Sequence, residues 1–141
     1  MATLTATTYA NQPRILHSGV ISVSGSFNSG STSIDASATT VLLCKIPNKA
    51  TILDVIEHHT TGAATCPVDI GVDDTLSAFV TQATQASVTR ATVGANLPYT
   101  VSKSDDVSAA SNFATLKATY TPGTATASLK CNFTVLYTMD K

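Results

Sequence analysis

The sequence contains few charged residues. Only 12% of its 141 residues are Asp, Glu, Lys or Arg, which is about half of the roughly 25% usual in soluble domains. The eight Lys and Arg residues are scattered along the chain, and the formal net charge is -1. A surface that binds nucleic acid or an anionic membrane needs clustered basic side chains. We therefore expect neither nucleic acid nor a membrane as a partner.

Aromatic residues and long hydrophobic runs are also scarce. The chain has no Trp, and aromatic residues make up 6% of it, so the sequence offers no stacking platform for single-stranded nucleic acid or sugars. No apolar run approaches the roughly 20 residues of a membrane-spanning helix. The start, MATLTATTYANQPR, lacks the basic segment and apolar stretch of a signal peptide. We expect a protein that is made in a cytoplasm and is not exported by a standard signal.

The chain has three cysteines, Cys44, Cys66 and Cys131. An odd number at wide spacing does not form a disulfide framework. Each cysteine lies in or beside an apolar, strand-like run, so we expect all three to be buried as small hydrophobic residues.

Short runs rich in β-branched residues predict an all-β protein. Alternation in SGVISVSGSF (18–27) puts Ile21, Val23 and Phe27 on one face of a strand. Further strand-like runs, separated by turn signals, lie at residues 39–46, 50–60, 65–72, 112–120 and 125–139, and weaker or edge strands are expected at 87–94 and 97–107. About eight strands at roughly 8–12-residue spacing predict a single-domain antiparallel β-sandwich that is jelly-roll-like.

One segment is predicted to be a short helix. In DDTLSAFVTQATQA (73–86), Leu76, Phe79 and Val80 have helical spacing. Asp73 or Asp74 could cap this helix at its start.

The first 17 residues are predicted to form an extended N-terminal arm. They are Thr-rich and lack sustained periodicity, so we expect them to be ordered only where a partner or a neighbouring subunit holds them. The expected organisation is an arm at 1–17 and a sandwich domain at 18–141, which is long enough to bury a core. The expected core residues are Ile21, Val23, Phe27, Leu42, Leu43, Ile46, Ile52, Val55, Val68, Ile70, Leu116, Phe133 and Val135.

The adjacent histidines His58 and His59 are the first candidates for chemistry. On a strand, neighbours point to opposite faces, so the pair cannot grip one metal. Glu57 and His59 do share a face, but two ligands fall short of a zinc site. We interpret both histidines as ordinary surface or interface residues, which would make association sensitive to pH near 6 to 7.

No other segment predicts catalysis. The sequence lacks the G-x-S-x-G and phosphate-loop patterns. Cys44 lies inside VLLCKI, which is typical of a buried strand and an inert thiol. The carboxylates of DIGVDD do not follow a calcium-loop pattern. We expect a protein that is not an enzyme and needs no cofactor.

The central stretch resembles a known group of proteins. It runs from an apolar strand ending in KIP, through ATILDV and DIGV, to DDTLSAF, and the chain closes on FTVLYT. This order resembles the capsid cement or decoration proteins encoded in the head-gene region of tailed bacteriophages. The resemblance covers about residues 38–80 and 125–138, and it is carried by small motifs.

The resemblance implies a non-enzymatic role on a phage capsid. It implies a jelly-roll-like fold, binding to the major capsid protein, a location on the capsid exterior after synthesis in the host bacterial cytoplasm, and a homo-oligomer, a trimer above other states. Arms and loops are where such proteins touch their neighbours. The expected interface residues are Thr7, Tyr9, Asn11, Arg14, His17, His58 and His59.

Two alternatives remain open from the sequence. A head-fibre or tail-tip adsorption module that binds a host glycan would need an exposed aromatic cluster, and the four tyrosines are dispersed. A cupin-type metalloenzyme would need an H-x-H motif with distal ligands, which EHH (57–59) only approximates.

Overall fold

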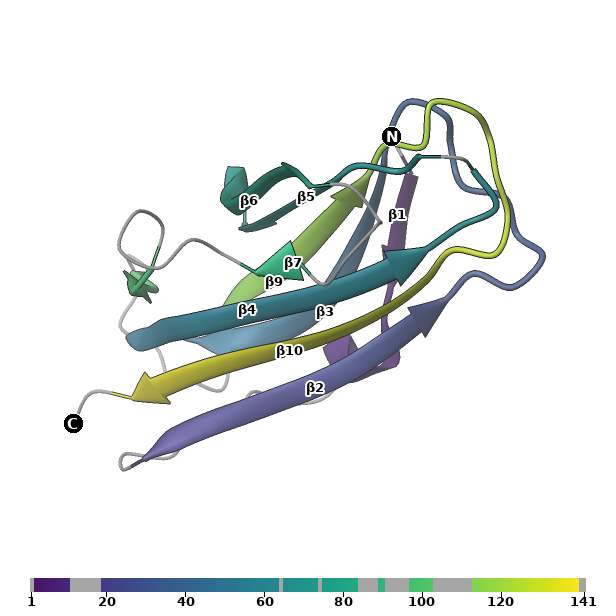
Figure 1. Cartoon of the computed structure of the whole chain (residues 1–141). Coiled ribbons are helices and arrows are strands. Elements are labelled where there is room, and N and C mark those ends of the chain that lie inside the picture. Colours follow the sequence, from purple (N-terminus) through teal and green to yellow (C-terminus); the bar gives the residue numbers. More distant parts are fainter. Residues whose placement is uncertain are drawn as a thin grey trace.

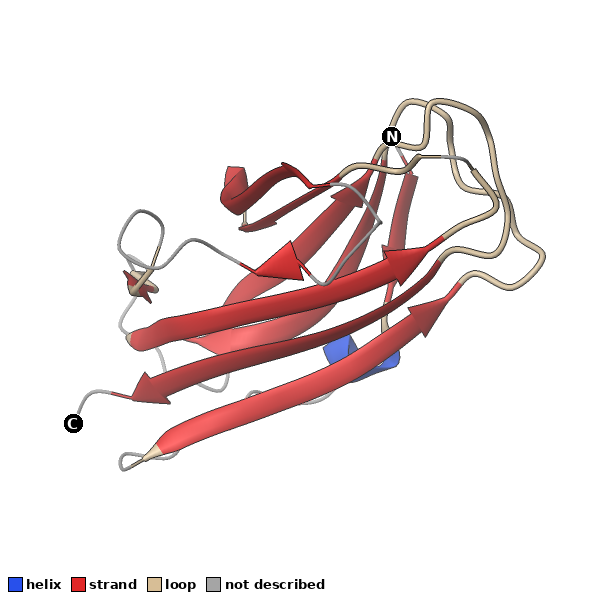
Figure 2. Ribbon diagram, viewed as in Figure 1, coloured by secondary structure: helices blue, strands red, loops and turns tan. Residues whose placement is uncertain are grey.

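The chain folds into two facing β-sheets (Figures 1 and 2). In the computed structural model the described residues are 2–10, 19–63, 65–73, 75–83, 89–90, 97–102 and 113–139. The strands of the first sheet, in order across it, are β1 (Ala2–Thr5), β3 (Thr39–Pro47), β9 (Phe113–Tyr120), β5 (Val68–Val72) and β6 (Thr75–Ala83). Those of the second are β2 (Val20–Asn28), β10 (Lys130–Met139), β4 (Ala50–Thr60) and β7 (Thr89–Arg90), and β8 (Tyr99–Thr100) also pairs with β4. The prediction of an all-β sandwich is confirmed.

The strand pairs nest inside one another along the chain. β2 pairs with β10, β3 with β9, β4 with β7 and β5 with β6, all antiparallel. Strands β2 to β5 therefore alternate between the two sheets. The chain folds like one long hairpin rolled up on itself, which places the last strand, β10, in the middle of its sheet between β2 and β4.

The core lies between the sheets and contains most of the residues predicted for it. Of the thirteen expected core residues, ten are buried, and only Val23, Phe27 and Leu42 are partly exposed. Val23 and Phe27 lie on β2, which is the edge of its sheet and so has a neighbouring strand on one side only. Leu42 pairs with Lys117 beside a register shift in β3, which places it away from the core.

A bulge explains the imperfect alternation of β4. The register between β4 and β10 shifts at Leu136/Tyr137, and Leu53 is left without a partner in β10. An extra residue on one strand reverses the face on which later residues lie. Both Ile52, before the bulge, and Val55, after it, are therefore buried.

Residues 75–83 form strand β6, so the predicted helix is wrong. The register between β5 and β6 shifts twice, because β6 carries extra residues. These bulges put the neighbours Phe79 and Val80 together on the buried side, which imitates helical spacing in the sequence. Gly71 on β5 permits the irregular pairing, because a side chain there would occupy the space of the Thr75 and Leu76 backbone.

Asp73 holds two strands together and does not cap a helix. Its N–H donates to the Thr115 carbonyl at 3.0 Å, and its Oδ1 accepts from the Thr115 N–H at 3.0 Å. Asp69 similarly accepts from the backbone N–H of Gln82 at 2.7 Å and from its side-chain amide at 2.8 Å. Two carboxylates of DIGVDD are thus structural, and Asp74 lies outside the described residues.

The first part of the predicted arm belongs to the sandwich. β1 pairs in parallel with the start of β3. The Ala6 N–H donates to the Leu42 carbonyl at 2.9 Å, and Ala6 is 1% exposed. The expectation that only a partner orders the arm is therefore wrong for residues 2–10. Residues 11–17 lie outside the described residues, so the boundary at 17 stays a prediction.

A short 3-10 helix, η1 (Thr7–Ala10), follows β1 and packs on β2 and β3. Gly25 of β2 makes room for it. A side chain at Gly25 would meet the Thr8 hydroxyl and, at 2.9 Å, the Phe133 ring.

No helix among the described residues is long and apolar enough to span a membrane.

Candidate functional site

The outer surface of strands β2, β10 and β4 is regular and nearly uncharged. We call it the β2–β10–β4 face. Its outward positions form five cross-strand rows: Val20–Thr138–Thr51, Ser22–Leu136–Asp54, Ser24–Thr134–Ile56, Ser26–Asn132–His58 and Asn28–Lys130–Thr60. Most of these side chains carry a hydroxyl or an amide. Formal charge is confined to Lys130 at one end and to Asp54 near the other.

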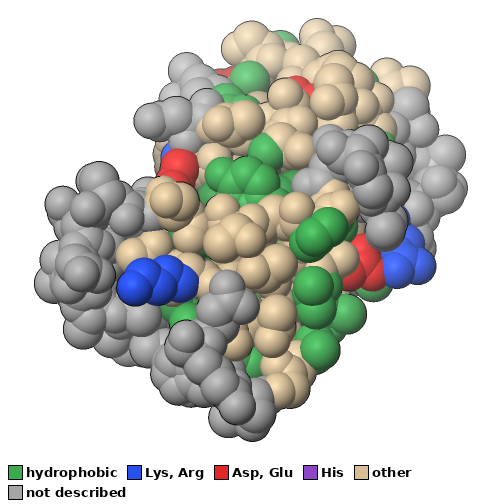
Figure 3. All heavy atoms as spheres, turned by 90° about the vertical axis from the view of Figure 1, so that its left-hand side faces the viewer, with side chains coloured by type: hydrophobic (Ala, Val, Ile, Leu, Met, Phe, Trp, Pro, Cys, Tyr) green, Lys and Arg blue, Asp and Glu red, His purple; other side chains and the backbone are tan. Residues whose placement is uncertain are grey.

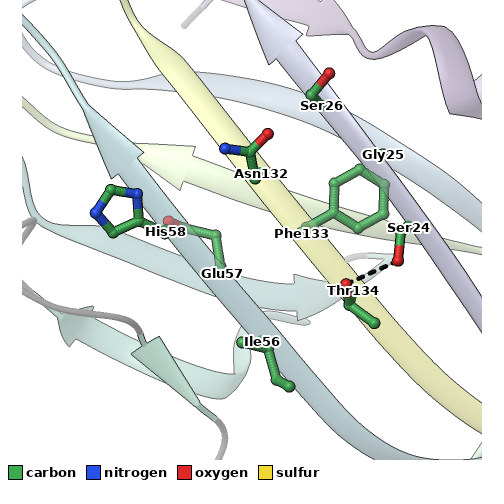
Figure 4. A pocket seen from close by; sticks show the side chains of 9 residues that line it. All are labelled: Ser24, Gly25, Ser26, Ile56, Glu57, His58, Asn132, Phe133 and Thr134. Atoms are coloured by element: carbon green, nitrogen blue, oxygen red, sulfur yellow. Dashed lines mark hydrogen bonds between the residues drawn. The ribbon is translucent and has the colours of Figure 1, made fainter.

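A hollow of about 430 Å³ lies in this face (Figure 4). Its lining residues are Ser24, Gly25, Ser26, Ile56, Glu57, His58, Asn132, Phe133 and Thr134. The Ser24 and Thr134 hydroxyls hydrogen-bond to each other across β2 and β10 at 2.8 Å. Asn132 and His58 are paired neighbours on β10 and β4. The exposed side chains of the hollow thus offer hydroxyl, amide and imidazole groups, whereas Glu57 and Phe133 of its lining are buried.

One ion pair marks the margin of the β2–β10–β4 face. Arg90 of β7 donates through Nη2 to Oδ2 of Asp54 on β4. Asp54 is 7% exposed, and its Oδ1 has no hydrogen-bond partner in the part of the chain that the structure describes. The Arg90 side chain is 60% exposed. The pair neutralises the one buried carboxylate of this face.

The two adjacent histidines lie on opposite sides of β4, as predicted. His58 is exposed on the β2–β10–β4 face, whereas His59 is 1% exposed and points into the sandwich. His59 is therefore buried inside its own chain. The interpretation of His59 as a surface or interface residue is wrong, because the bulge in β4 keeps Glu57 and His59 on the buried side.

Glu57 and His59 form a buried pair. Nδ1 of His59 lies 2.7 Å from Oε1 of Glu57, and its Nε2 lies 2.5 Å from the carbonyl oxygen of Cys66. A carbonyl and an ionised carboxylate both accept hydrogen bonds, so an imidazolium with two N–H donors satisfies both. The Tyr120 ring packs edge-on against the imidazole at a centroid distance of 5.0 Å. This pair ties β4 to the segment before β5.

The surroundings of His59 keep it protonated. Burial lowers the pKa of His59, but hydrogen bonds to the Cys66 carbonyl and to Glu57, together with the attraction of that carboxylate, outweigh burial. The result is a pKa raised from 6.5 to about 10. We infer a structural imidazolium and not a catalytic base, because a base must be unprotonated near its working pH.

Other ionisable groups inside the sandwich are also buried. Burial raises the pKa of the Cys131 thiol to about 11 and that of the Cys44 thiol to about 12. Burial likewise raises the pKa of the Tyr120 hydroxyl. All three cysteines are buried and unpaired, as predicted. Among the described residues, no group of three or more His, Cys, Asp or Glu side chains could hold a metal ion.

The N-terminal interface candidates are described only in part. Thr7 and Tyr9 lie in η1, and Tyr9 is half-buried. Asn11, Arg14 and His17 lie outside the described residues. Sequence reasoning missed Lys45 of β3, whose Nζ lies 5.1 Å from the Tyr9 ring centre and 4.8 Å from that of Phe113. A lysine this close to two aromatic rings makes cation–π contacts with both. No local sequence pattern indicates these contacts, because Tyr9 and Phe113 are far from Lys45 in the sequence.

The described part of the surface at one end of the sandwich is also low in charge. Figure 3 shows uncharged polar and backbone atoms with small scattered hydrophobic groups, and acidic and basic side chains at only a few points. Among the described residues, the one large hydrophobic side chain that is clearly exposed is Val20, at 57%. The described part of the face in Figure 3 and the β2–β10–β4 face therefore both carry few charged side chains.

Comparison with known proteins finds similarity in structure only. No protein-family model matches the sequence, and no curated protein matches it. The fold is similar to that of a chain in the capsid of Ralstonia phage GP4, with a TM-score of 0.63 and 12% identity over 99% of both chains. A chain from the acid-stable capsid of Helicobacter pylori bacteriophage KHP30 has a TM-score of 0.46 and 15% identity, over 89% of this chain and 92% of that chain. The first likeness shows that the two chains share a fold from end to end.

Proposed function

We propose that this protein is a non-enzymatic structural component of a phage virion, a cement or decoration protein that binds and stabilises the major capsid protein shell. The observation that carries the proposal is the match of the whole sandwich, over 99% of both chains, to a chain of a phage capsid. The KIP, ATILDV and DIGV motifs, which resemble those of phage head proteins, support it independently.

The sandwich is proposed to be a jelly roll. A jelly roll has eight strands in two Greek keys and is common in viral capsids. The nested pairs β2–β10, β3–β9, β4–β7 and β5–β6 support this assignment, because they involve eight strands split equally between two sheets. β1 and β8 are then additions to that framework.

The β2–β10–β4 face is proposed to contact the major capsid protein. Its hydroxyl and amide side chains form hydrogen bonds without the desolvation cost of buried charge. His58 and Asn132 lie on this face beside the hollow. Tyr9 and residues 11–17 are proposed to extend the contact, as the resemblance implies for an N-terminal segment.

The remaining parts of the proposal follow from the resemblance. The protein would be made in the host bacterial cytoplasm and would sit on the capsid exterior. It would associate with itself, as a trimer above other states, since closed symmetry lets each copy present the same patch. The non-enzymatic role is supported by the protonated, inward-facing His59 and by thiols whose pKa is raised by burial.

Co-sedimentation with phage heads tests the proposal. Purified protein is mixed with heads assembled without it, and bound copies are counted after pelleting. We expect saturable binding that Asn132→Lys or His58→Glu weakens at least tenfold, since each places a new charge in the interface. Ser77→Lys, at an exposed site on β6 of the other sheet, is the matched control.

Two results would contradict the proposal. One is the absence of binding to any head. The other is equal binding by the face variants and the wild type, which would show that the β2–β10–β4 face is not the contact surface. A glycan array, run on the same protein, tests the alternative adsorption module. Specific glycan binding without head binding would favour that alternative.

A further inference from the structure

Strand β2 is a long edge strand that lacks most of the usual protection. Natural sheets protect their edges with short strands, charges, prolines, bulges or a covering helix or loop, because an open edge pairs with other chains. The short helix η1 contacts β2 at Gly25, on the side that faces the Phe133 ring. β2 is nine residues long, has no charge and no proline, and keeps one register with β10 throughout. Among the described residues, β10 is the only strand that pairs with it.

The other sheet edges are protected. β6 has two register shifts, and Gln82 within it has a φ of 50°. β7 and β8 have two residues each, and β7 carries Arg90. β1 has four residues. The contrast singles out β2 as the edge that is built to receive a strand.

Hydrophobic side chains gather along this same edge. Val20 is 57% exposed. Val23 and Phe27 pack against the core but remain partly exposed. A further strand beside β2 would cover all three, which adds apolar burial to the backbone hydrogen bonds of strand addition.

We propose that β2 binds β2 of a second copy of this chain, antiparallel, about a two-fold axis at Ser24. In that register Val20 faces Asn28, Ile21 faces Phe27, Ser22 faces Ser26 and Val23 faces Gly25. Every outward pair joins a hydroxyl or amide to a small residue or to Val20, and every inward pair is apolar or contains glycine. The strand is self-complementary, as an isologous contact requires.

The absence of charged residues on β2 also supports a second copy of this chain as the partner. At a two-fold axis through Ser24 the two copies of this residue face each other, so a charge there would face a like charge. None of its nine residues is charged. The Ser24–Thr134 hydrogen bond would continue across the axis as a row of four hydroxyls on adjacent strands.

The contact would be modest in strength. One strand pair buries less than the roughly 1,200 Å² of a standard stable interface. We therefore expect a dimer that dissociates on dilution. It is a two-fold contact, distinct from the three-fold ring of the proposed function, and it is measured without phage heads, so its failure and the failure of head binding are separate results.

Cysteine cross-linking tests the register directly. Opposed Cα atoms in an antiparallel pair lie about 4.5–5.5 Å apart, within the range that a disulfide bridges. Ser24→Cys should therefore give a disulfide-linked dimer under mild oxidation. In Ser22→Cys the two thiols lie four residues apart along the strands, about 13 Å, and should not cross-link. A mixture of Ser22→Cys and Ser26→Cys chains should.

The native thiols do not interfere, because all three are buried. A charge variant gives a second, independent readout by analytical ultracentrifugation. Ser24→Lys should raise the dimer dissociation constant at least ~10-fold, because the two ammonium groups would face each other. His58→Lys adds the same charge on the same face but two strands from the edge, and should leave dimerisation unchanged.

Three results would overturn the proposal. A monomer at all concentrations, with no Ser24→Cys cross-link, rules out the contact. A trimer in solution with no Ser24→Cys cross-link assigns self-association to another surface. Cross-linking of Ser22→Cys alone, with none from Ser24→Cys, rules out this register.

Discussion

Removing either member of the Glu57–His59 pair should strongly destabilise the fold. In Glu57→Leu, His59 loses its carboxylate partner; in His59→Leu, a carboxylate and the Cys66 carbonyl are left unpaired in the core. Breaking a buried pair by deleting one partner costs about 3–5 kcal/mol. For a chain of this size that corresponds to a loss of roughly 10–20 °C in Tm.

The double variant separates the interaction energy between Glu57 and His59 from the contribution that each side chain makes alone. With Glu57→Leu and His59→Leu together, neither charge of the pair remains in the core, and the main cost is the unpaired Cys66 carbonyl, about 1–3 kcal/mol. The two single losses should therefore sum to several kcal/mol more than the loss of the double variant. His58→Leu, one residue away on the exposed face, is the control and should change stability by less than about 0.5 kcal/mol.

The pair also predicts how stability depends on pH. The pKa of His59 is raised from 6.5 to about 10 in the folded protein. A raised pKa means that the folded state binds the proton more tightly, so this stabilisation is fully present below pH 6.5 and is lost as pH rises toward 10. The loss should reach a few kcal/mol. It should be absent in the double variant.

Urea unfolding followed by circular dichroism is the appropriate measurement, since the chain has no Trp for fluorescence. Stability is determined between pH 6 and 10 for the wild type and the four variants. The reasoning is refuted if each single variant costs less than 1 kcal/mol, or if the single costs simply add. It is equally refuted if the wild type gains stability, relative to the double variant, from pH 6.5 to 10.

Further predictions concern the N-terminal segment and the thiols. Deleting residues 1–10 should cost on the order of 2 kcal/mol, because β1 and the buried Ala6 are removed; an unchanged Tm would mean that β1 contributes nothing. Gly25→Val should expose η1 to limited proteolysis by displacing Thr8, whereas Ser26→Val, outward on the same strand, should not. Lys45→Met should cost about 0.5–1 kcal/mol through lost cation–π contacts with Tyr9 and Phe113. All three cysteines should react with a thiol reagent at pH 8 only after unfolding in urea, since they are buried; rapid labelling of the folded chain would contradict this.

The sequence predicted the regular parts of the sandwich well. Period-2 alternation in 18–27 and the β-branched runs at 39–46 and 125–139 mark strands because each has one face on the core. β2, β3 and β10 occupy those segments in the structure. Which residues of these strands are buried was equally predictable, since the hydrophobic face of a strand packs against the core.

The predictions that were wrong or missing concern features that depend on contacts between residues far apart in the sequence. Residues 75–83 looked helical because bulges place Phe79 and Val80 side by side, and those bulges are set by pairing with β5. The arm looked unstructured because β1 has no pattern of its own and gains its order from β3. Lys45 gave no signal because its aromatic partners, Tyr9 and Phe113, approach it only in the folded chain.

In strand β4, one bulge determines which of two adjacent histidines is buried and which is exposed. Alternation alone says that His58 and His59 oppose each other, but not which of them faces water. The extra residue at Leu53 decides it, by placing His59 beside Glu57 in the core and His58 on the β2–β10–β4 face. Substitution of His59 should therefore change stability, and substitution of His58 should change binding with the fold intact. Deletion of Leu53 would make Ile52 and Asp54 adjacent, as their partners Tyr137 and Leu136 already are, so His58 should stay outward and His59 inward.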